Sequence, residues 1–230
     1  MFLVVKTGNT MKDLALHYGD FEDWMIRFMG VMRQNVMVVD VQKENLPDSF
    51  DFYGILITGA HEMVTDRHDW SERTAEWLRR AVEKSVPVMG VCYGHQLLAH
   101  ALGGMVDNHP KGPEIGTVDV NLTAEAKKDP VFKSLPQTFR VHVSHTQSAL
   151  TLPEGAVVLA NNPYEPHHAF RYGKNAWGVQ FHPEYDALIS REYVLNQKEK
   201  LKSPELTLGG VEETPEANSL LGKFCEYCVK

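Results

Sequence analysis

The sequence predicts an α/β fold with a central, mostly parallel sheet, flanking helices and added β-hairpins. Up to residue 91, short apolar runs alternate with helical patterns; the runs are FLVV (2–5), VMVVDV (36–41), YGILITG (53–59) and VPVMGV (86–91). This alternation is typical of βαβ units and a parallel sheet. After residue 104 the apolar runs are separated by turn residues with little helix between them, which predicts hairpins that flank the main sheet.

The individual elements follow from local patterns. Between the third and fourth runs, residues 67–85 have apolar residues at helical intervals, and Asp69 and Glu72 have the spacing of a capping box, so a crossover helix is expected. Residues 200–218 mix Pro, Gly and charge as a surface loop does, and a terminal helix is expected from Leu220. The later strands are predicted at 116–123, 138–145, 156–161, 167–173 and 176–182.

Composition limits the class of protein. The 230 residues suit a single domain over 1–230, and 43% hydrophobic residues can build a sizeable core. A formal net charge of -7 offers no basic surface for nucleic acid or an anionic membrane. No apolar run reaches the roughly 18 residues of a membrane span. We therefore expect a cytoplasmic protein whose partners are small molecules or other proteins, with no nucleic acid and no membrane.

Cysteine and histidine usage gives little support for a metal site. The three cysteines fit no disulfide framework, which favours a reducing compartment. Cys225 and Cys228 form a single CxxC in the terminal helix, where packing is the favoured interpretation. The eleven histidines have no HExxH or comparable ligand spacing. No metal and no cofactor are expected.

The segment PVMGVCYGHQLLAHALGG (87–104) has the pattern of a nucleophile elbow, in which a strand, Gly-x-nucleophile-x-Gly and a helix follow one another. Gly90 and Gly94 remove side chains where strand and helix meet, and Cys92 would be held in a strained backbone conformation. The positive end of the helix would stabilise a thiolate, and the Tyr93 N–H would bind an oxyanion. The alternative is a buried cysteine at a strand end.

A partner for Cys92 decides between these interpretations. In GVQFHPEY (178–185) an apolar strand ends at His182, and Pro183 prevents regular continuation so that Glu184 can return toward the imidazole. His182 would take the thiol proton and later donate it to the leaving amine, and Glu184 would orient the ring. The residues themselves indicate acyl transfer on a carbonyl and nothing more specific.

Together, GVCYGHQLLAHALGG and GVQFHPEY resemble the class I glutamine amidotransferase family, most closely the glutaminase domain of GMP synthetase. Cys92, His182 and Glu184 match the family triad. The resemblance implies a flavodoxin-like α/β architecture. It also implies hydrolysis of the side-chain amide of glutamine through a γ-glutamyl thioester, with release of ammonia and glutamate.

The resemblance extends to the oxyanion hole and the substrate site. Thr58, Gly59, Ala60 and His61 stand where the family has Ser-Gly-Gly-Pro, so Ala60 is expected to supply the second oxyanion N–H and Gly59 to lie beside the substrate. Gln96 matches a residue that contacts bound glutamine. Three further positions, in VSHTQSAL (143–150), resemble the Ser-His-x-Asp loop that holds the amino-acid end of glutamine: Ser144, His145 and, in place of the acid, Gln147.

Three functions are compatible with these residues. The first is a glutaminase that delivers ammonia to a separate synthetase subunit, since the sequence has no GxxxxGK[ST] loop and no synthetase half is expected. The second is a free-standing hydrolase of γ-glutamyl peptides, which a neutral Gln147 would suit. The third, from another class, is a non-catalytic binding or regulatory module, against which the complete set of Cys92, His182 and Glu184 argues.

Overall fold

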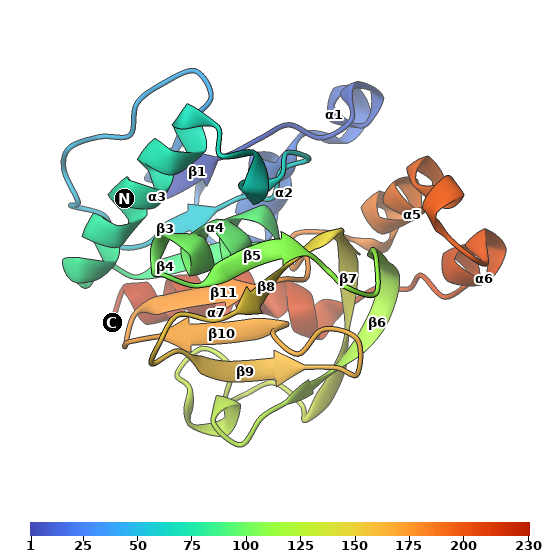
Figure 1. Ribbon diagram of the computed structural model, residues 1–230. Coiled ribbons are helices and arrows are strands. Elements are labelled where there is room, and N and C mark those ends of the chain that lie inside the picture. The colour runs from blue at the N-terminus through green and yellow to red at the C-terminus, as the bar shows by residue number, and fades with distance from the viewer.

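The computed structural model describes all 230 residues, and its main feature is one nine-stranded sheet (Figure 1). The strand order is β2-β1-β3-β4-β11-β10-β9-β6-β7, and β5 and β8 form a separate two-stranded sheet. The strands are β1 (Phe2–Lys6), β2 (Val36–Asp40), β3 (Ile55–Ile57), β4 (Val88–Val91), β5 (Met105–Asn108), β6 (Glu114–Leu122), β7 (Thr138–His145), β8 (Gln147–Thr151), β9 (Val157–Asn161), β10 (Ala169–Tyr172) and β11 (Ala176–Val179).

One half of the sheet is parallel, as the alternating apolar runs predict. Strands β2, β1, β3, β4 and β11 all run in the same direction, with Val4 opposite Leu56 and Leu56 opposite Met89. Because parallel strands end at a common edge, the residues that follow β3, β4 and β11 are brought together there. This edge carries the site described below.

The other half of the sheet is antiparallel. Strands β11, β10, β9, β6 and β7 pair antiparallel in that order, so the expected hairpins extend the main sheet and do not flank it. Pairing to a central strand satisfies backbone groups that a separate hairpin would leave open. The short β5–β8 pair was not predicted, because β5 is only four residues long and mostly exposed.

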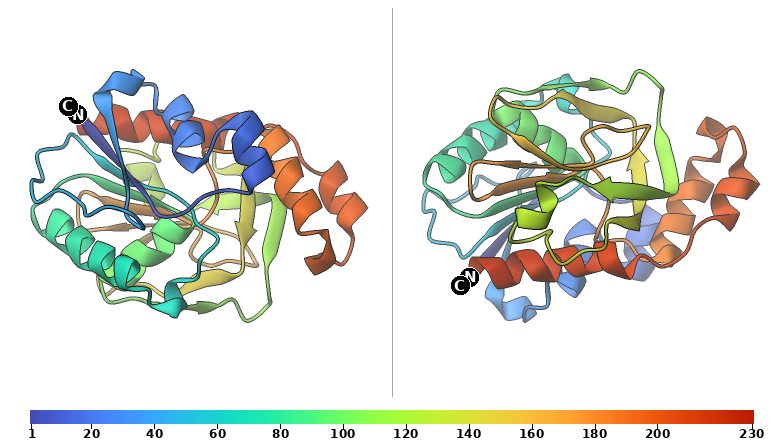
Figure 2. Two further views of the ribbon diagram at one scale, coloured as in Figure 1. Left: turned by 90° about the horizontal axis from the view of Figure 1, so that it is seen from above. Right: turned by 90° about the horizontal axis from the view of Figure 1, so that it is seen from below.

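Helices cover both faces of the sheet (Figure 2). On β1, Phe2 and Val4 face the layer formed by α2 and α7, whereas Leu3 and Val5 face α3 and α4. This two-residue alternation along a fully buried strand gives each helical layer its own core. The helices are α1 (Lys12–Tyr18), α2 (Phe21–Met29), α3 (Asp69–Glu83), α4 (Tyr93–Ala101), α5 (Ala187–Asn196), α6 (Pro204–Gly209) and α7 (Pro215–Cys228).

Two local expectations differ from the structure. Helix α3 begins at Asp69 with His68 as its N-cap, so Asp69 cannot cap it, and Glu72 instead contacts Arg67 and His100. Residues 200–218, expected as a surface loop, contain the short helix α6 and the first residues of α7. Proline at the start of both helices explains the difference, because it is tolerated in a first helical turn as well as in loops.

No helix has the length and apolarity needed to cross a bilayer.

Candidate active site

The turn after β4 holds Cys92 in the strained conformation that a nucleophile elbow requires. Cys92 is the N-cap of α4 and has φ 51° and ψ -102°, one of only three non-glycine residues with positive φ. Such backbone strain is costly and persists where the surrounding structure enforces it. The side chain is buried and forms part of the wall of a cavity.

The two glycines around Cys92 are required by close packing. A Cβ atom on Gly90 would collide with the carbonyl group of Gly94, and one on Gly94 would lie 2.6 Å from the carbonyl oxygen of Ile57. Strand β4, helix α4 and strand β3 therefore meet at distances that only glycine permits. This packing directs the N-terminus of α4, with its partial positive charge, at Cys92.

His182 and Glu184 reach Cys92 from the neighbouring strand. Strand β11 pairs parallel with β4, with Val179 opposite Val91, so the chain leaving β11 runs beside the elbow. His182 Nδ1 lies 2.8 Å from Glu184 Oε1, and both side chains are almost completely buried. A Cβ built on Gly59 would lie 3.2 Å from His182 Cε1 and 3.8 Å from Cys92 Cβ, so both residues lie against this glycine.

The electrostatic environment of His182 favours its protonated form. Burial lowers the pKa of His182, but the negative charges of Glu184 and Cys92 raise it more, to about 10. Nε2 is buried and has no hydrogen-bond partner other than the Cys92 thiol, whose hydrogen bond also raises this pKa. The ring nitrogen remote from Glu184 is therefore free to exchange a proton with the cysteine or with a substrate.

The two backbone groups predicted to stabilise an oxyanion both border the cavity beside Cys92. Tyr93 is the first residue of α4, so its N–H has no partner within the helix. Ala60 lies in the loop after β3, and its N–H donates to no backbone carbonyl. The Tyr93 hydroxyl bonds Ser71 at 2.7 Å, which leaves its backbone as the group available to a substrate.

The cavity has a volume of about 240 Å³. It brings together Cys92 and six of the seven residues predicted for the oxyanion hole and the substrate, while Gly59 lies behind its wall against His182. The lining residues are Ala60, His61, Glu62, Met63, Cys92, Tyr93, Gln96, Ser144, His145, Thr146, Gln147, Tyr193, Asn196, Gln197 and Lys200.

The predicted substrate residues are not equally free. The side-chain amide of Gln96 donates to the Gln147 carbonyl at 2.8 Å and to Gln180 Oε1 at 3.1 Å, so it holds the neighbouring loop. Ser144 Oγ accepts a hydrogen bond from Gln197 Nε2 at 2.7 Å. The imidazole of His145 points inward to Glu114, leaving its backbone at the cavity. Gln147 Oε1 is buried with no partner.

One wall of the cavity was missed by sequence reasoning. Tyr193, Asn196, Gln197 and Lys200 come from α5 and the turn after it. Their spacing of three, four and seven residues is that of one helical face, a signal present in the sequence. The Tyr193 hydroxyl lies 3.0 Å from His61 Nε2, so this wall is joined to the loop after β3.

The other two cysteines do not line the cavity. No group of three or more His, Cys, Asp or Glu side chains is placed to hold a metal ion. Cys225 lies on the buried face of α7, Cys228 at the end of that helix is half-buried, and neither forms a disulfide. Burial raises the pKa of Cys225 to about 12, which keeps this thiol protonated at neutral pH.

Comparison with known proteins gives one consistent family. A family model described as "Glutamine amidotransferase class-I" matches residues 16–199. A glutamine-hydrolyzing GMP synthase of Aeropyrum pernix is 35% identical over 179 residues, which is 77% of this chain and 33% of that protein. The chain thus spans only about a third of the length of this relative.

Two further relatives are closer in length. Gamma-glutamyl peptidase 4 of Arabidopsis thaliana is 26% identical over 174 residues, covering 74% of this chain and 69% of that protein. The crystal structure of a glutamine amidotransferase from Thermotoga maritima superposes with a TM-score of 0.76 over 100% of this chain and 98% of that one, at 22% identity. At this identity the structural match establishes the shared fold.

Proposed function

Because the chain belongs to the class I glutamine amidotransferase family, we propose that it hydrolyses the side-chain amide of glutamine to glutamate and ammonia, with Cys92 as the nucleophile. The observation that carries the proposal is the arrangement of Cys92, His182 and Glu184 at one edge of the parallel sheet. An imidazole nitrogen whose only partner is a strained cysteine is the geometry of an activated thiol.

The first half of the reaction forms the thioester. The Cys92 thiolate attacks the side-chain carbonyl carbon, and the oxyanion that forms accepts hydrogen bonds from the Tyr93 and Ala60 N–H groups. His182 donates its Nε2 proton to the amide nitrogen as the C–N bond breaks, so ammonia leaves. Glu184 keeps Nδ1 protonated and the ring oriented through its 2.8 Å contact.

Water completes the reaction. His182, now neutral, removes a proton from water, whose oxygen attacks the thioester carbonyl at the same oxyanion site. The C–S bond breaks, glutamate leaves and the thiolate–imidazolium pair is restored. The negative charges of Glu184 and Cys92 favour this pair, because they stabilise the imidazolium.

The second candidate substrate is a γ-glutamyl peptide, which has the same acyl group and a larger leaving amine. The similarity to gamma-glutamyl peptidase 4 over most of that protein favours it. As a glutaminase, the chain would pass ammonia to a separate synthetase subunit in the cytoplasm, and its three free cysteines fit such a reducing compartment.

The deciding experiment is a turnover assay on the purified chain with glutamine and a panel of γ-glutamyl dipeptides. It is paired with a glutamine-like electrophilic label followed by mass spectrometry. We expect one label per chain, on Cys92, and none on Cys225, whose raised pKa keeps it protonated. No turnover on any of these substrates together with no labelling of Cys92 would favour a non-catalytic binding module.

A further inference from the structure

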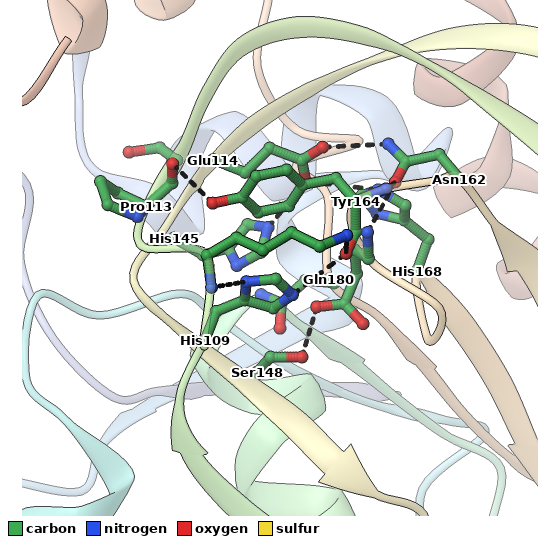
Figure 3. A network of polar contacts seen from close by, with 12 residues as sticks. His109, Pro113, Glu114, His145, Ser148, Asn162, Tyr164, His168 and Gln180 are labelled. Carbon is green, nitrogen blue, oxygen red and sulfur yellow. Dashed lines mark hydrogen bonds and ion pairs between the residues drawn. The ribbon is translucent and has the colours of Figure 1, made fainter. Parts of the chain in front are cut away.

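Beside residues 144–148, where β7 ends and β8 begins, lies a buried carboxylate that the proposed reaction does not use (Figure 3). Glu114, the first residue of β6, accepts from Asn162 Nδ2 at 2.9 Å through Oε1. Its Oε2 lies 3.0 Å from His145 Nε2 and 3.3 Å from His168 Nε2. Burial raises the pKa of Glu114, but the hydrogen bonds from the two histidines lower it more, to well below its ordinary value. The carboxylate is therefore ionised.

His145 links the Glu114 carboxylate to Gln147, which lines the cavity. Its Nε2 faces the Glu114 carboxylate, and its Nδ1 lies 3.0 Å from the carbonyl oxygen of Gln147. Both partners are acceptors, so both ring nitrogens must donate, as they do in an imidazolium. The same carbonyl accepts from Gln96 Nε2 at 2.8 Å. Two donors thus fix the peptide group of Gln147.

A second buried carboxylate holds the other side of Gln147. Ser148 Oγ donates to Glu165, which is fully buried and also accepts from the His167 N–H at 2.8 Å. The residues on both sides of Gln147 are therefore attached to buried acids. Rotation of this segment would break hydrogen bonds to charged groups, which are the strong ones.

The side chain of Gln147 is oriented as well. Its Nε2 donates to Thr65 Oγ1 at 2.6 Å. Its Oε1 is a buried acceptor that has no hydrogen-bond partner. Gln147 is one of the residues that line the cavity. A buried acceptor without a donor is unfavourable, and a cationic donor from a ligand would satisfy it. Glutamine and γ-glutamyl peptides both carry such a donor, the α-ammonium group.

We propose that Glu114 and His145 are positioning residues that act through the Gln147 carbonyl to hold Gln147 Oε1 ready for the α-ammonium group of the substrate. The inference rests on the proposed function, because it places the amino-acid end of a glutamyl substrate at Gln147. It assigns to a buried ion pair the positioning of Gln147, whose Oε1 would take the place of the acidic residue that the family resemblance leads one to expect.

The test measures kcat and KM of wild type and Glu114→Gln with glutamine and with 5-amino-5-oxopentanoate, which lacks the α-amino group. The substitution removes the carboxylate charge that faces His145 Nε2, so the hydrogen bond from His145 Nδ1 to the Gln147 carbonyl is no longer supported by an ion pair. We expect a KM for glutamine about tenfold higher, with kcat within about threefold, because the lost contact is remote from the reacting carbon. For the analogue without the amino group, KM should be nearly the same in both proteins.

Asp129→Asn is the matched control. Asp129 is also a buried carboxylate, pairs with Arg171 at 2.9 Å, and makes no hydrogen bond or ion pair to residues 144–148. Both variants should melt at a lower temperature, and only Glu114→Gln should change KM. If Glu114→Gln does not fold, His145→Gln replaces it with the same expected change in KM.

The outcomes separate the two proposals. An active wild type whose Glu114→Gln variant has the KM of Asp129→Asn overturns the inference and leaves the proposed function standing. An equal rise in KM for glutamine and for the analogue shows that the loop does not bind the ammonium group, and also overturns it. A wild type inactive on glutamine and on every γ-glutamyl peptide overturns the proposed function, and the inference falls with it.

Discussion

The imidazole of His182 stacks on the ring of Tyr185, with 4.0 Å between the ring centroids and 13° between the ring planes. The contact with Glu184 orients one ring nitrogen of His182, and the stacked Tyr185 ring fixes the orientation of the imidazole plane. Both aromatic side chains are buried, so the stack restricts rotation of the proposed acid–base group.

This stack predicts different effects of two substitutions at position 185. Tyr185→Phe keeps the ring, so kcat should stay within about twofold, whereas Tyr185→Leu removes the flat surface and should lower kcat by about tenfold or more. Steady-state kinetics on both variants, with thermal melts to confirm folding, is the measurement. Equal kcat values for the two variants would show that the stack does not orient His182.

Cys92→Ser should abolish nearly all turnover while leaving substrate binding intact. A serine hydroxyl lacks the thiolate character that the N-terminus of α4 and His182 are arranged to support, so we expect a loss of roughly a thousandfold or more. Turnover and calorimetric binding are measured on the same preparation. Cys225→Ser serves as the control and should retain wild-type kcat. A Cys92→Ser variant with more than about a tenth of wild-type turnover would contradict the assignment.

The pKa of His182 predicts a pH dependence. Burial lowers this pKa, but the charges of Glu184 and Cys92 raise it from the ordinary 6.5 to about 10. Because the pKa of His182 is raised in the folded protein, its interactions with Glu184 and Cys92 contribute fully to stability below about pH 6.5. This contribution is lost as the pH rises through about 10. The rate of thioester formation should fall over the same upper range, since neutral His182 cannot protonate the leaving ammonia.

The measurement is an NMR titration of the histidine rings in wild type and in Cys92→Ser. The serine variant lacks the thiolate charge, so its His182 pKa should be lower than that of wild type. A wild-type His182 that titrates near 6.5 would mean that the two charges do not act on it as the geometry implies.

Gln147→Glu should lower KM for glutamine more than it changes kcat. The carboxylate keeps the length of the side chain and places a charge where the unpartnered Oε1 now lies, and hydrogen bonds between charged groups are about twice as strong as neutral ones. The contact is the same in ground and transition states, so kcat should change little. An unchanged KM, measured by steady-state kinetics, would show that another group binds the ammonium.

Gly94→Ala should reduce both stability and activity. Its Cβ would lie 2.6 Å from the Ile57 carbonyl oxygen, so α4 must shift, at a cost of about 1–3 kcal/mol in the free energy of unfolding. Gly209→Ala is the control, because nothing lies within 4 Å of the added Cβ. Urea denaturation of both variants is the test, and a Gly94→Ala protein as stable as the control would show that the packing around the elbow can relax.

Much of the site follows from short motifs. The strand, the Gly-x-Cys-x-Gly turn and the helix around Cys92 depend on residues adjacent in the chain, and the structure has the strained backbone that they predict. The parallel half of the sheet was equally predictable from the sequence, because buried parallel strands are continuous apolar runs. By contrast, Asp69 and Glu72 have capping-box spacing without forming a cap, since the same residue types also occur within the first turn of a helix.

The sequence by itself determined which groups can do chemistry: a cysteine at a strand–helix turn, a histidine at a strand end and a carboxylate two residues beyond it. Only the tertiary structure decided what surrounds them. The parallel pairing of β11 with β4 brings His182 to Cys92, the packing of α5 adds Tyr193, and the pairing of β6 with β7 places Glu114 beside His145. These contacts join segments far apart in the chain. Strand order and sheet register set them, and local hydrophobic periodicity does not record either one.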